Sequence, residues 1–314
     1  MSRQRGLTVA ELLIAVVIGA LVALLAVTLL LTSNAGFLAQ AQAASVDEAG
    51  RFALASIERA ARQAAFVDWE REDMAAGLDP GAPPRIRGLD AATLPASSAA
   101  LANPRPHAVN GSDILALRFA GAGPDEGDGS MTTCAGFSVG AGQDGWSIFY
   151  VGRNAAGVAE LRCKYKGASN WSAEAVIGGV DSFQVLYGVD TDTVPDGTAN
   201  SYLSASDINA LDTTLALDGA TDAQRGRDQM RKTWWKRVAS IKVALVLHGA
   251  TPSRDAYGAV VLDLFGAAYS RATGAADRGT RLTRAELSPE LQERERRTFS
   301  ATILLRNRQS EPAK

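Results

Sequence analysis

Histidine and cysteine are scarce in this chain, with two of each among 314 residues. A metal site built from them needs ligands at short, characteristic spacings, and neither His107 nor His248 lies at such a spacing from Cys134 or Cys163. Nucleophilic catalysis needs a nucleophile beside a base, and neither histidine falls in a Gly-x-Ser-x-Gly or His-x-x-x-His setting. The sequence therefore predicts a protein that is not an enzyme and that needs no cofactor and no metal.

An excess of charge of either sign is also missing. The chain has 32 basic and 34 acidic residues and a net charge of −2, which gives no general attraction to nucleic acid. We expect no nucleic-acid partner. The basic cluster near the C-terminus, Arg294, Arg296 and Arg297, is interleaved with Glu293 and Glu295. This alternation favours the solvated face of a helix over a nucleic-acid patch.

Charge is absent altogether from Leu12 to Leu31, where all 20 residues are apolar or small. At about 1.5 Å per residue such a helix spans about 30 Å, enough to cross the core of a bilayer. Arg3 and Arg5 precede the run, and because positive charge stays cytoplasmic we expect the bulk of the chain outside the cytoplasm. Glu11 lies at the start of the run. A charge inside a membrane helix costs about 2.5–3.5 kcal/mol, so Glu11 is expected to have a partner.

The residues around Gly6 differ from an ordinary secretory signal, whose small-residue cleavage site follows the apolar run. Here Gly6 precedes the run and is followed by Leu7, Thr8 and, three residues later, Glu11. Together with the basic leader, this arrangement resembles the start of the type IV prepilins, which usually have Phe at the position of Leu7. The alternative is a plain single-pass anchor in which these residues coincide by chance.

The prepilin resemblance implies three features of the N-terminus. A prepilin peptidase would cut after Gly6 and N-methylate Leu7. Thr8 and Glu11 would be assembly residues, and Glu11 would pair with the amino-terminal charge of a neighbouring subunit. A buried carboxylate needs a cation, and the apolar run contains no Lys or Arg that could serve instead.

Cys134 and Cys163 are the only cysteines. In an exported chain, a single pair of cysteines indicates one disulfide. Closing a loop of about 30 residues would stabilise the fold by about 3–4 kcal/mol in the chain-entropy model. The alternative is a pair of buried free thiols.

Beyond Leu31 the helical pattern continues, but the apolar residues now form one stripe. They recur at spacings of three and four: Val46, Ala49, Ala53, Ile57, Ala60 and Ala64. We therefore predict one helix from Leu7 to about Phe66. The expected segments are a leader (1–6), the transmembrane half of the helix (7–31), its amphipathic half (32–66), a Pro-rich irregular segment (67–112) and a β-rich globular domain (113–314).

Past residue 110 the hydrophobic period becomes two, which is typical of strands. The clearest examples lie near residues 115–119, 146–151, 158–164, 183–187, 241–247 and 299–305. Loops rather than alternating helices join them, which predicts an α+β fold with a long N-terminal helix packed on an antiparallel β-sheet, as in pilins. Trp234 and Trp235 precede one strand and are interpreted as the edge of the core, although paired aromatics also suit subunit contacts.

Four further segments resemble, in the family's order, the PilW family of minor pilins: Gly111–Arg118, Val180–Asp190, Trp235–Val238 and Phe299–Arg308. The resemblance implies a role in starting, and in capping, a type IV pilus used in adhesion and motility. The implied partners are prepilin peptidase, other minor pilins and the major pilin, with a tip adhesin as a further candidate. The chain would lie in the inner membrane with its C-terminal domain in the periplasm, and later in the pilus at the cell surface.

Two points of this resemblance stay open. The segment 251–295 departs from the family's pattern and is expected to be an insertion without an assigned role. A pseudopilin of a type II secretion system, of the J-like kind, is the alternative to a pilus subunit, because it shares the prepilin start and a similar sheet.

One acidic loop could carry a cation. Asp190, Asp192 and Asp196, followed by Gly197, place three carboxylates within seven residues, as hard cations such as Ca²⁺ prefer. The spacing is not that of an EF-hand, and the same residue types build ordinary solvated turns. A turn is the preferred interpretation, and calcium binding is the alternative.

Overall fold

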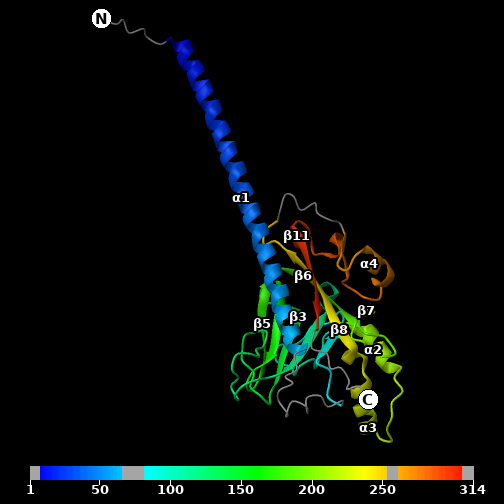
Figure 1. Cartoon of the computed structure of the whole chain (residues 1–314). Helices are drawn as coiled ribbons and strands as arrows, with labels where there is room; N and C mark the ends of the chain where they lie inside the picture. The colour runs from blue at the N-terminus through cyan, green and yellow to red at the C-terminus, as the bar shows by residue number, and fades with distance from the viewer. Residues whose placement is uncertain (1–7, 66–80, 253–260, 306–314) are drawn as a thin grey trace. The chain divides into compact units, whose positions relative to one another are not determined.

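The computed structural model describes residues 8–65, 81–252 and 261–305 (Figure 1). The chain divides into two compact units, Met1–Ser45 and Val46–Lys314. Helix α1 (Val9–Ala65) begins in the first unit and ends in the second. The long N-terminal helix is thus confirmed, while the predicted first and last helical residues, Leu7 and Phe66, lie outside the described part of the chain.

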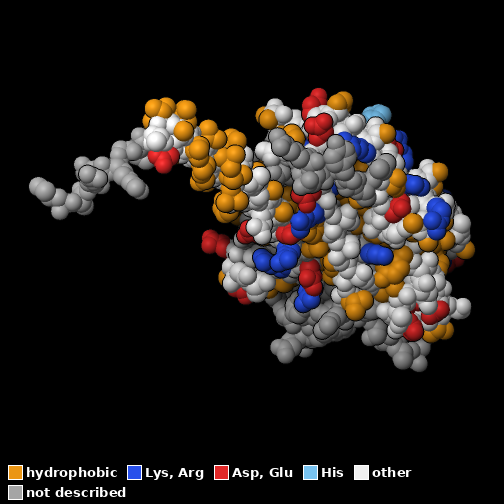
Figure 2. Space-filling model, turned by 90° about the horizontal axis from the view of Figure 1, so that it is seen from above, with side chains coloured by type: hydrophobic (Ala, Val, Ile, Leu, Met, Phe, Trp, Pro, Cys, Tyr) orange, Lys and Arg blue, Asp and Glu red, His pale blue; other side chains and the backbone are white. Residues whose placement is uncertain are grey.

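In the first unit the apolar side chains of the helix are exposed. All residues from Thr8 to Ala41 are exposed, and Figure 2 shows the hydrophobic side chains along this stretch. Its most apolar 18 residues have a mean hydropathy of 3.0, and among the described residues it is the one helix long and apolar enough to cross a membrane. The hydroxyls of Thr28 and Thr32 donate to the carbonyls of Leu25 (2.9 Å) and Thr28 (2.7 Å). These two hydroxyls are therefore satisfied within the helix, as a bilayer requires.

In the second unit the helix buries the predicted stripe against the sheets. Ala53, Ile57, Ala60 and Ala64 are at most 2% exposed. Gly50 lies so close to the ring of Phe299 that a Cβ on this glycine would be 2.6 Å from its carbons. Small residues on this side of the helix thus let it approach the strands closely.

The strands form antiparallel sheets, as predicted, but the single sheet expected from the sequence is divided. A five-stranded sheet has the order β1-β2-β3-β4-β5, a four-stranded sheet has the order β11-β8-β6-β7, and β9 and β10 form a small pair. The bounds in the first sheet are β1 (Ile86–Leu89), β2 (Ile114–Ala120), β3 (Asp144–Arg153), β4 (Ala159–Lys166) and β5 (Trp171–Gly178). In the second sheet they are β6 (Val180–Val189), β7 (Ser201–Leu203), β8 (Val238–His248) and β11 (Arg296–Leu304).

The division occurs at the junction between β5 and β6. Gly179 has φ +72°, a left-handed conformation that favours glycine, and it separates the two strands. The chain then pairs with β8, whose partner residues are 49 to 67 positions away. Local periodicity predicts strands but not their distant partners, so the sequence did not show the division.

One core joins α1 to the inner faces of both large sheets, with Leu117, Phe149 and Leu161 from the first sheet and Val185 and Val243 from the second. Two further segments cover the outer faces. Ala92 and Leu94 pack over the first sheet. Leu264, Leu282 and Leu287 pack on Ala244 and Val246 of β8.

The second of these covering segments belongs to the region expected to be an insertion, 251–295. Its described part contains β9 (Val261–Asp263), α4 (Ala267–Thr273), β10 (Arg281–Thr283), η4 (Arg284–Glu286) and α5 (Pro289–Gln292). Because it shields β8 from solvent, this segment has a structural role that the sequence did not reveal.

Short helices between β7 and β8 were also missed. They are α2 (Ala205–Thr213), α3 (Asp222–Lys232) and the 3-10 turn η3 (Trp234–Arg237); another turn, η2 (Val109–Gly111), precedes β2. Capping boxes start α2 and α3, formed by Ser204 with Asp207 and by Thr221 with Gln224. Trp235 of η3 is 2% exposed and meets Tyr187 edge-on at 4.8 Å, so it belongs to the core.

Candidate functional site

Thr8 and Glu11 form a capping box at the described start of α1. Oε2 of Glu11 accepts hydrogen bonds from the backbone N–H (2.9 Å) and the hydroxyl (3.0 Å) of Thr8. The N–H of Glu11 donates to the hydroxyl of Thr8 at 3.3 Å. Two of the N–H groups that a helix leaves without partners at its start are therefore satisfied by these two side chains. The structure brings together the two predicted assembly residues.

The second carboxylate oxygen of Glu11, Oε1, makes no hydrogen bond within the described part of the chain. Along α1 the first basic residue after Glu11 is Arg51, 40 residues away or about 60 Å at helical rise. The charge of Glu11 therefore has no cation within reach on its own helix. The predicted cleavage and methylation residues, Gly6 and Leu7, lie outside the described residues.

The predicted disulfide between Cys134 and Cys163 is present, with the two Cα atoms 5.9 Å apart. Cys163 lies in β4 and is 1% exposed, whereas Cys134 lies in the loop between β2 and β3. The N–H of Cys134 also donates to the hydroxyl of Ser147 at 2.9 Å. The bond thus fastens an irregular loop to the first sheet beside α1.

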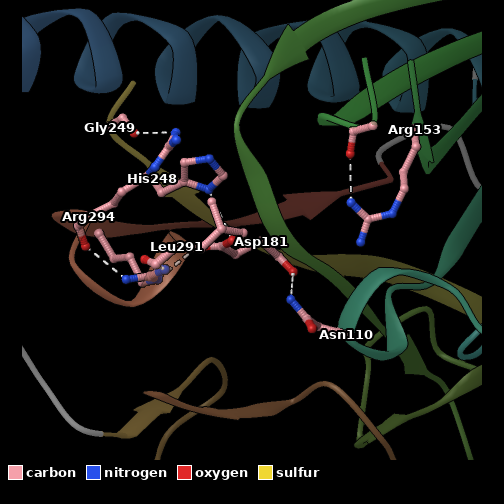
Figure 3. Close-up of polar contacts among 9 residues, drawn as sticks. Asn110, Arg153, Asp181, His248, Gly249, Leu291 and Arg294 are labelled. Atoms are coloured by element: carbon pink, nitrogen blue, oxygen red, sulfur yellow. Dashed lines mark hydrogen bonds and ion pairs between the residues drawn. The ribbon is translucent and has the colours of Figure 1, made fainter. Parts of the chain in front are cut away.

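The C-terminal arginines correct one expectation. Arg296 and Arg297 are the first residues of strand β11 and do not form a helix face. Arg296 Nε donates to Asp181 Oδ2 at 2.8 Å, and His248 Nδ1 lies 3.0 Å from Asp181 Oδ1. Figure 3 shows Asp181 between His248 and Asn110. The side-chain amide of Asn110 donates to the backbone carbonyl of Asp181 at 2.8 Å.

This polar cluster ties the second sheet together at one end. Arg296 also donates to the carbonyls of Leu291 and Arg294, the latter at 2.8 Å, and Arg294 donates to the carbonyl of Gly249 at 3.3 Å. The Asp181 side chain is 1% exposed, and a buried carboxylate is tolerable only when cations and donors surround it. The cluster is therefore a structural ion network, and no signal in the sequence linked its widely spaced members.

Arg297 connects β11 to the helix. Its guanidinium lies 2.5 Å from Asp47 Oδ2, and both side chains are about one-third exposed. Asp47 lies on α1 outside the predicted apolar stripe. The pair shows that a polar residue of the helix also contacts the sheet.

The acidic loop between β6 and β7 brings Asp190, Asp192 and Asp196 together, with one carboxylate oxygen of each within 4.8 Å of the others. Asp190 is fully buried and accepts from the N–H groups of Asp192 (3.2 Å) and Gly197 (2.6 Å). The carboxylate therefore closes the loop on its own backbone, as in the turn that was the preferred interpretation.

Buried carboxylates near the joint of the two sheets were not predicted. Asp113 accepts from the N–H of Val185 in β6 (2.9 Å) and from that of Ala91 (3.1 Å). Burial, and secondarily the nearby charges of Asp90 and Asp277, raise the pKa of Asp113 well above its usual range. Burial also raises the pKa of Asp277 to about 6, although Tyr269 donates to it at 2.8 Å.

Comparisons with known proteins agree with this geometry. The family model described as type IV pilus-assembly protein W matches residues 148–307, which is 160 of the 314 residues. The prokaryotic N-terminal methylation motif matches residues 1–27, which include the Thr8–Glu11 pair. No curated protein and no solved structure matches the chain.

These matches describe a structural, pilin-type protein and not an enzyme family. Pilins of this type act with other pilins and the pilus machinery, and the methylation motif with one apolar helix fits a membrane-anchored subunit. The chain therefore belongs to the PilW family of type IV pilus-assembly proteins and is a minor pilin of the type IV pilus.

Proposed function

We propose that this minor pilin helps to initiate assembly of a type IV pilus and caps the finished filament. Prepilin peptidase removes residues 1–6 and N-methylates Leu7, so that Glu11 becomes the fifth residue of the mature chain. The observation that carries the initiation step is the single carboxylate of Glu11 at the start of α1, whose residues 8–41 are all exposed. Capping rests on the family match alone.

A carboxylate in hydrocarbon must pair with a cation or be protonated to its neutral form. The α-amine of the same chain is four residues before Glu11, about 6 Å lower on a rigid helix, which makes pairing within one subunit difficult. The amine of a neighbouring, axially shifted subunit meets no such restriction. Because Thr8 uses only Oε2 of Glu11, the neighbour's amine can bind Oε1 while the capping box stays intact. Each subunit would then select the neighbour that satisfies its carboxylate.

The same proposal includes the location of the protein in the cell and its partner subunits. The apolar half of α1 crosses the inner membrane, and the C-terminal domain folds in the periplasm, where an oxidising environment allows the Cys134–Cys163 disulfide. Residues 1–6 are the leader, 7–31 the membrane half and 32–66 the amphipathic half of the helix. Residues 67–112 follow and contribute β1 to the β-rich domain, which continues through 113–314. The subunit then moves to the pilus at the cell surface, beside other minor pilins, the major pilin and a candidate tip adhesin.

The experiment compares Glu11→Leu with Glu11→Gln. Gln at the third helical position keeps the capping box but carries no charge, so it separates capping of the helix from pairing with an amine. We expect both variants to insert, to be cut after Gly6, to begin with N-methyl-Leu7 in mass spectrometry and to form the disulfide. We expect few pili from either variant when filaments are counted by electron microscopy.

Normal piliation with Glu11→Gln would show that the charge does not guide docking. A mature chain that still begins at Met1 would contradict processing after Gly6. If deletion of the gene leaves piliation intact but blocks protein secretion, the pseudopilin alternative replaces this proposal.

A further inference from the structure

A small groove lies between α1 and a loop within the second unit. One wall is a helix stripe formed by Phe52, Ala55, Arg59 and Gln63, and the facing wall is the loop Thr133–Gly136, which contains the disulfide. We call this feature the Phe52 groove. Its volume is about 250 Å³, below the roughly 300–1,000 Å³ of sites that enclose a small molecule. A groove of this size suits one or two side chains of a protein partner.

The loop wall is held in place before any partner arrives. The disulfide fastens Cys134 to β4, and the N–H groups of Thr133 and Gly136 donate to the carbonyls of Phe137 and Thr133, both at 2.8 Å. The ring of Phe137 stacks on Tyr165 with centroids 5.1 Å apart. A partner would therefore bind without ordering this loop, which lowers the entropic cost of association.

One exposed phenylalanine lines this groove, and a second is the next residue in sequence after its loop wall. Phe52 is 58% exposed and Phe137 is 52% exposed, and they are the two exposed phenylalanines among the residues described beyond residue 45. Phe52 lines the helix wall, and Phe137 follows directly after the loop wall. Aromatic residues and arginine are enriched in protein interfaces, whereas an isolated domain gains nothing by exposing them.

Arg59 supplies the only charge in the lining. Its side chain is exposed and makes no hydrogen bond or ion pair with any residue that the structure describes. Asp47 and Glu58, by contrast, already pair with Arg297 and Arg62. A partner that brings a carboxylate would meet the Arg59 guanidinium on the helix wall of the groove, where a charged pair contributes to orientation and specificity.

We propose that the Phe52 groove docks a neighbouring pilin-type subunit, which inserts an apolar side chain beside Phe52 and places a carboxylate on Arg59. This inference rests on the proposed function, because it assumes that the chain is stacked with other subunits. It adds a second contact, between globular domains, to the contact that Glu11 makes through the membrane helix. It also gives the disulfide a purpose beyond stability, since the bond holds one wall of the site.

The test uses the full chain in cells that carry its native partners. A photo-cross-linking benzoylphenylalanine replaces Ala55 in the groove or, as a control, Glu58, which lies on the same helix outside the groove. We expect the Ala55 position to yield an adduct that mass spectrometry identifies as another pilin-type subunit, and the Glu58 position to yield little of it. Arg59→Glu should lower the adduct by about ten-fold or more, as expected for reversal of a close charge pair.

Arg51→Glu is the matched control variant, because Arg51 is exposed on α1 outside the groove. It should leave the adduct unchanged, and Arg59→Lys should retain part of it. Adducts only with lipid or with a protein that is not a pilin, or equal adducts for Arg59→Glu and Arg51→Glu, would overturn the inference. Formation of the disulfide in each variant shows that the domain has folded.

The two proposals fail in different ways. If deletion of the gene leaves the number of pili unchanged, the proposed function fails. If deletion removes the pili but folded Arg59→Glu restores them fully, only the Phe52 groove is wrong as a docking site.

Discussion

The close contact between Gly50 and Phe299 makes a quantitative prediction about how α1 is held on the sheet. A Cβ at position 50 would lie 2.6 Å from several ring carbons of Phe299, closer than real Cβ contacts allow. Gly50→Ala therefore has two opposing effects. Alanine favours the helix over glycine by about 0.8–1.0 kcal/mol. Overpacking against the ring costs about 1–3 kcal/mol.

Gly226→Ala isolates the first effect. Gly226 lies inside helix α3, and a Cβ there would have no atom within 4 Å. We expect Gly226→Ala to raise the free energy of unfolding and Gly50→Ala to leave it unchanged or lower it by up to about 2 kcal/mol. The difference between the two variants measures the overpacking alone. At about 2–4 °C per kcal/mol, it corresponds to roughly 2–12 °C in Tm.

The assay is thermal unfolding of the mature chain in detergent, followed by tryptophan fluorescence. A double-mutant cycle with Phe299→Ala provides the control, because Gly50→Ala should behave like Gly226→Ala once the ring is gone. If Gly50→Ala raises Tm as much as Gly226→Ala while Phe299 is present, the close helix–strand contact does not exist in the protein and the reasoning is refuted.

Two further predictions concern the same domain. The double variant Cys134→Ser/Cys163→Ser should lose about 3–4 kcal/mol of unfolding free energy in denaturant titrations, and an unchanged value would mean that the disulfide does not restrict the unfolded chain. The pKa values of Asp113 and Asp277 are raised in the folded domain, so the folded domain binds these protons more tightly than the unfolded chain does. The two protonated carboxyl groups therefore stabilise the fold at acidic pH. The part that comes from Asp277 is lost as the pH rises through about 6. We expect a higher denaturation midpoint at pH 5 than at pH 7.5, and Asp277→Asn should flatten that difference; a midpoint that rises with pH would show that other groups dominate.

Features that depend on neighbouring residues could be predicted from the sequence. The long helix, its membrane half and its buried alanine stripe follow from periodicity over a few turns. The Thr8–Glu11 pair follows from a spacing of three, which is the geometry of a capping box. The disulfide was predicted from a single pair of cysteines in a chain that we expected to be exported.

The same local reasoning misjudged the arginines near the C-terminus. Alternating Arg and Glu resemble the solvated face of a helix, but Arg296 and Arg297 begin a strand. Pairing with His248 and Leu247 of β8 determines that strand, and these residues are about 50 positions away. The ion pair of Arg296 with Asp181 spans 115 positions, so no local pattern could indicate it.

The sequence by itself determined the long N-terminal helix, because its apolar run, its buried stripe and its Thr8–Glu11 pair each depend on residues close together in the chain. Only the tertiary structure decided how the domain is built. In the folded protein the strands form two large sheets that separate at Gly179, and the segment 261–295 covers β8. Asp113 is buried where the two sheets meet, and the loop of Cys134 lies opposite Phe52. The physical reason is that a strand's pattern specifies which of its faces is buried, whereas its partners are chosen by packing between residues far apart in the sequence.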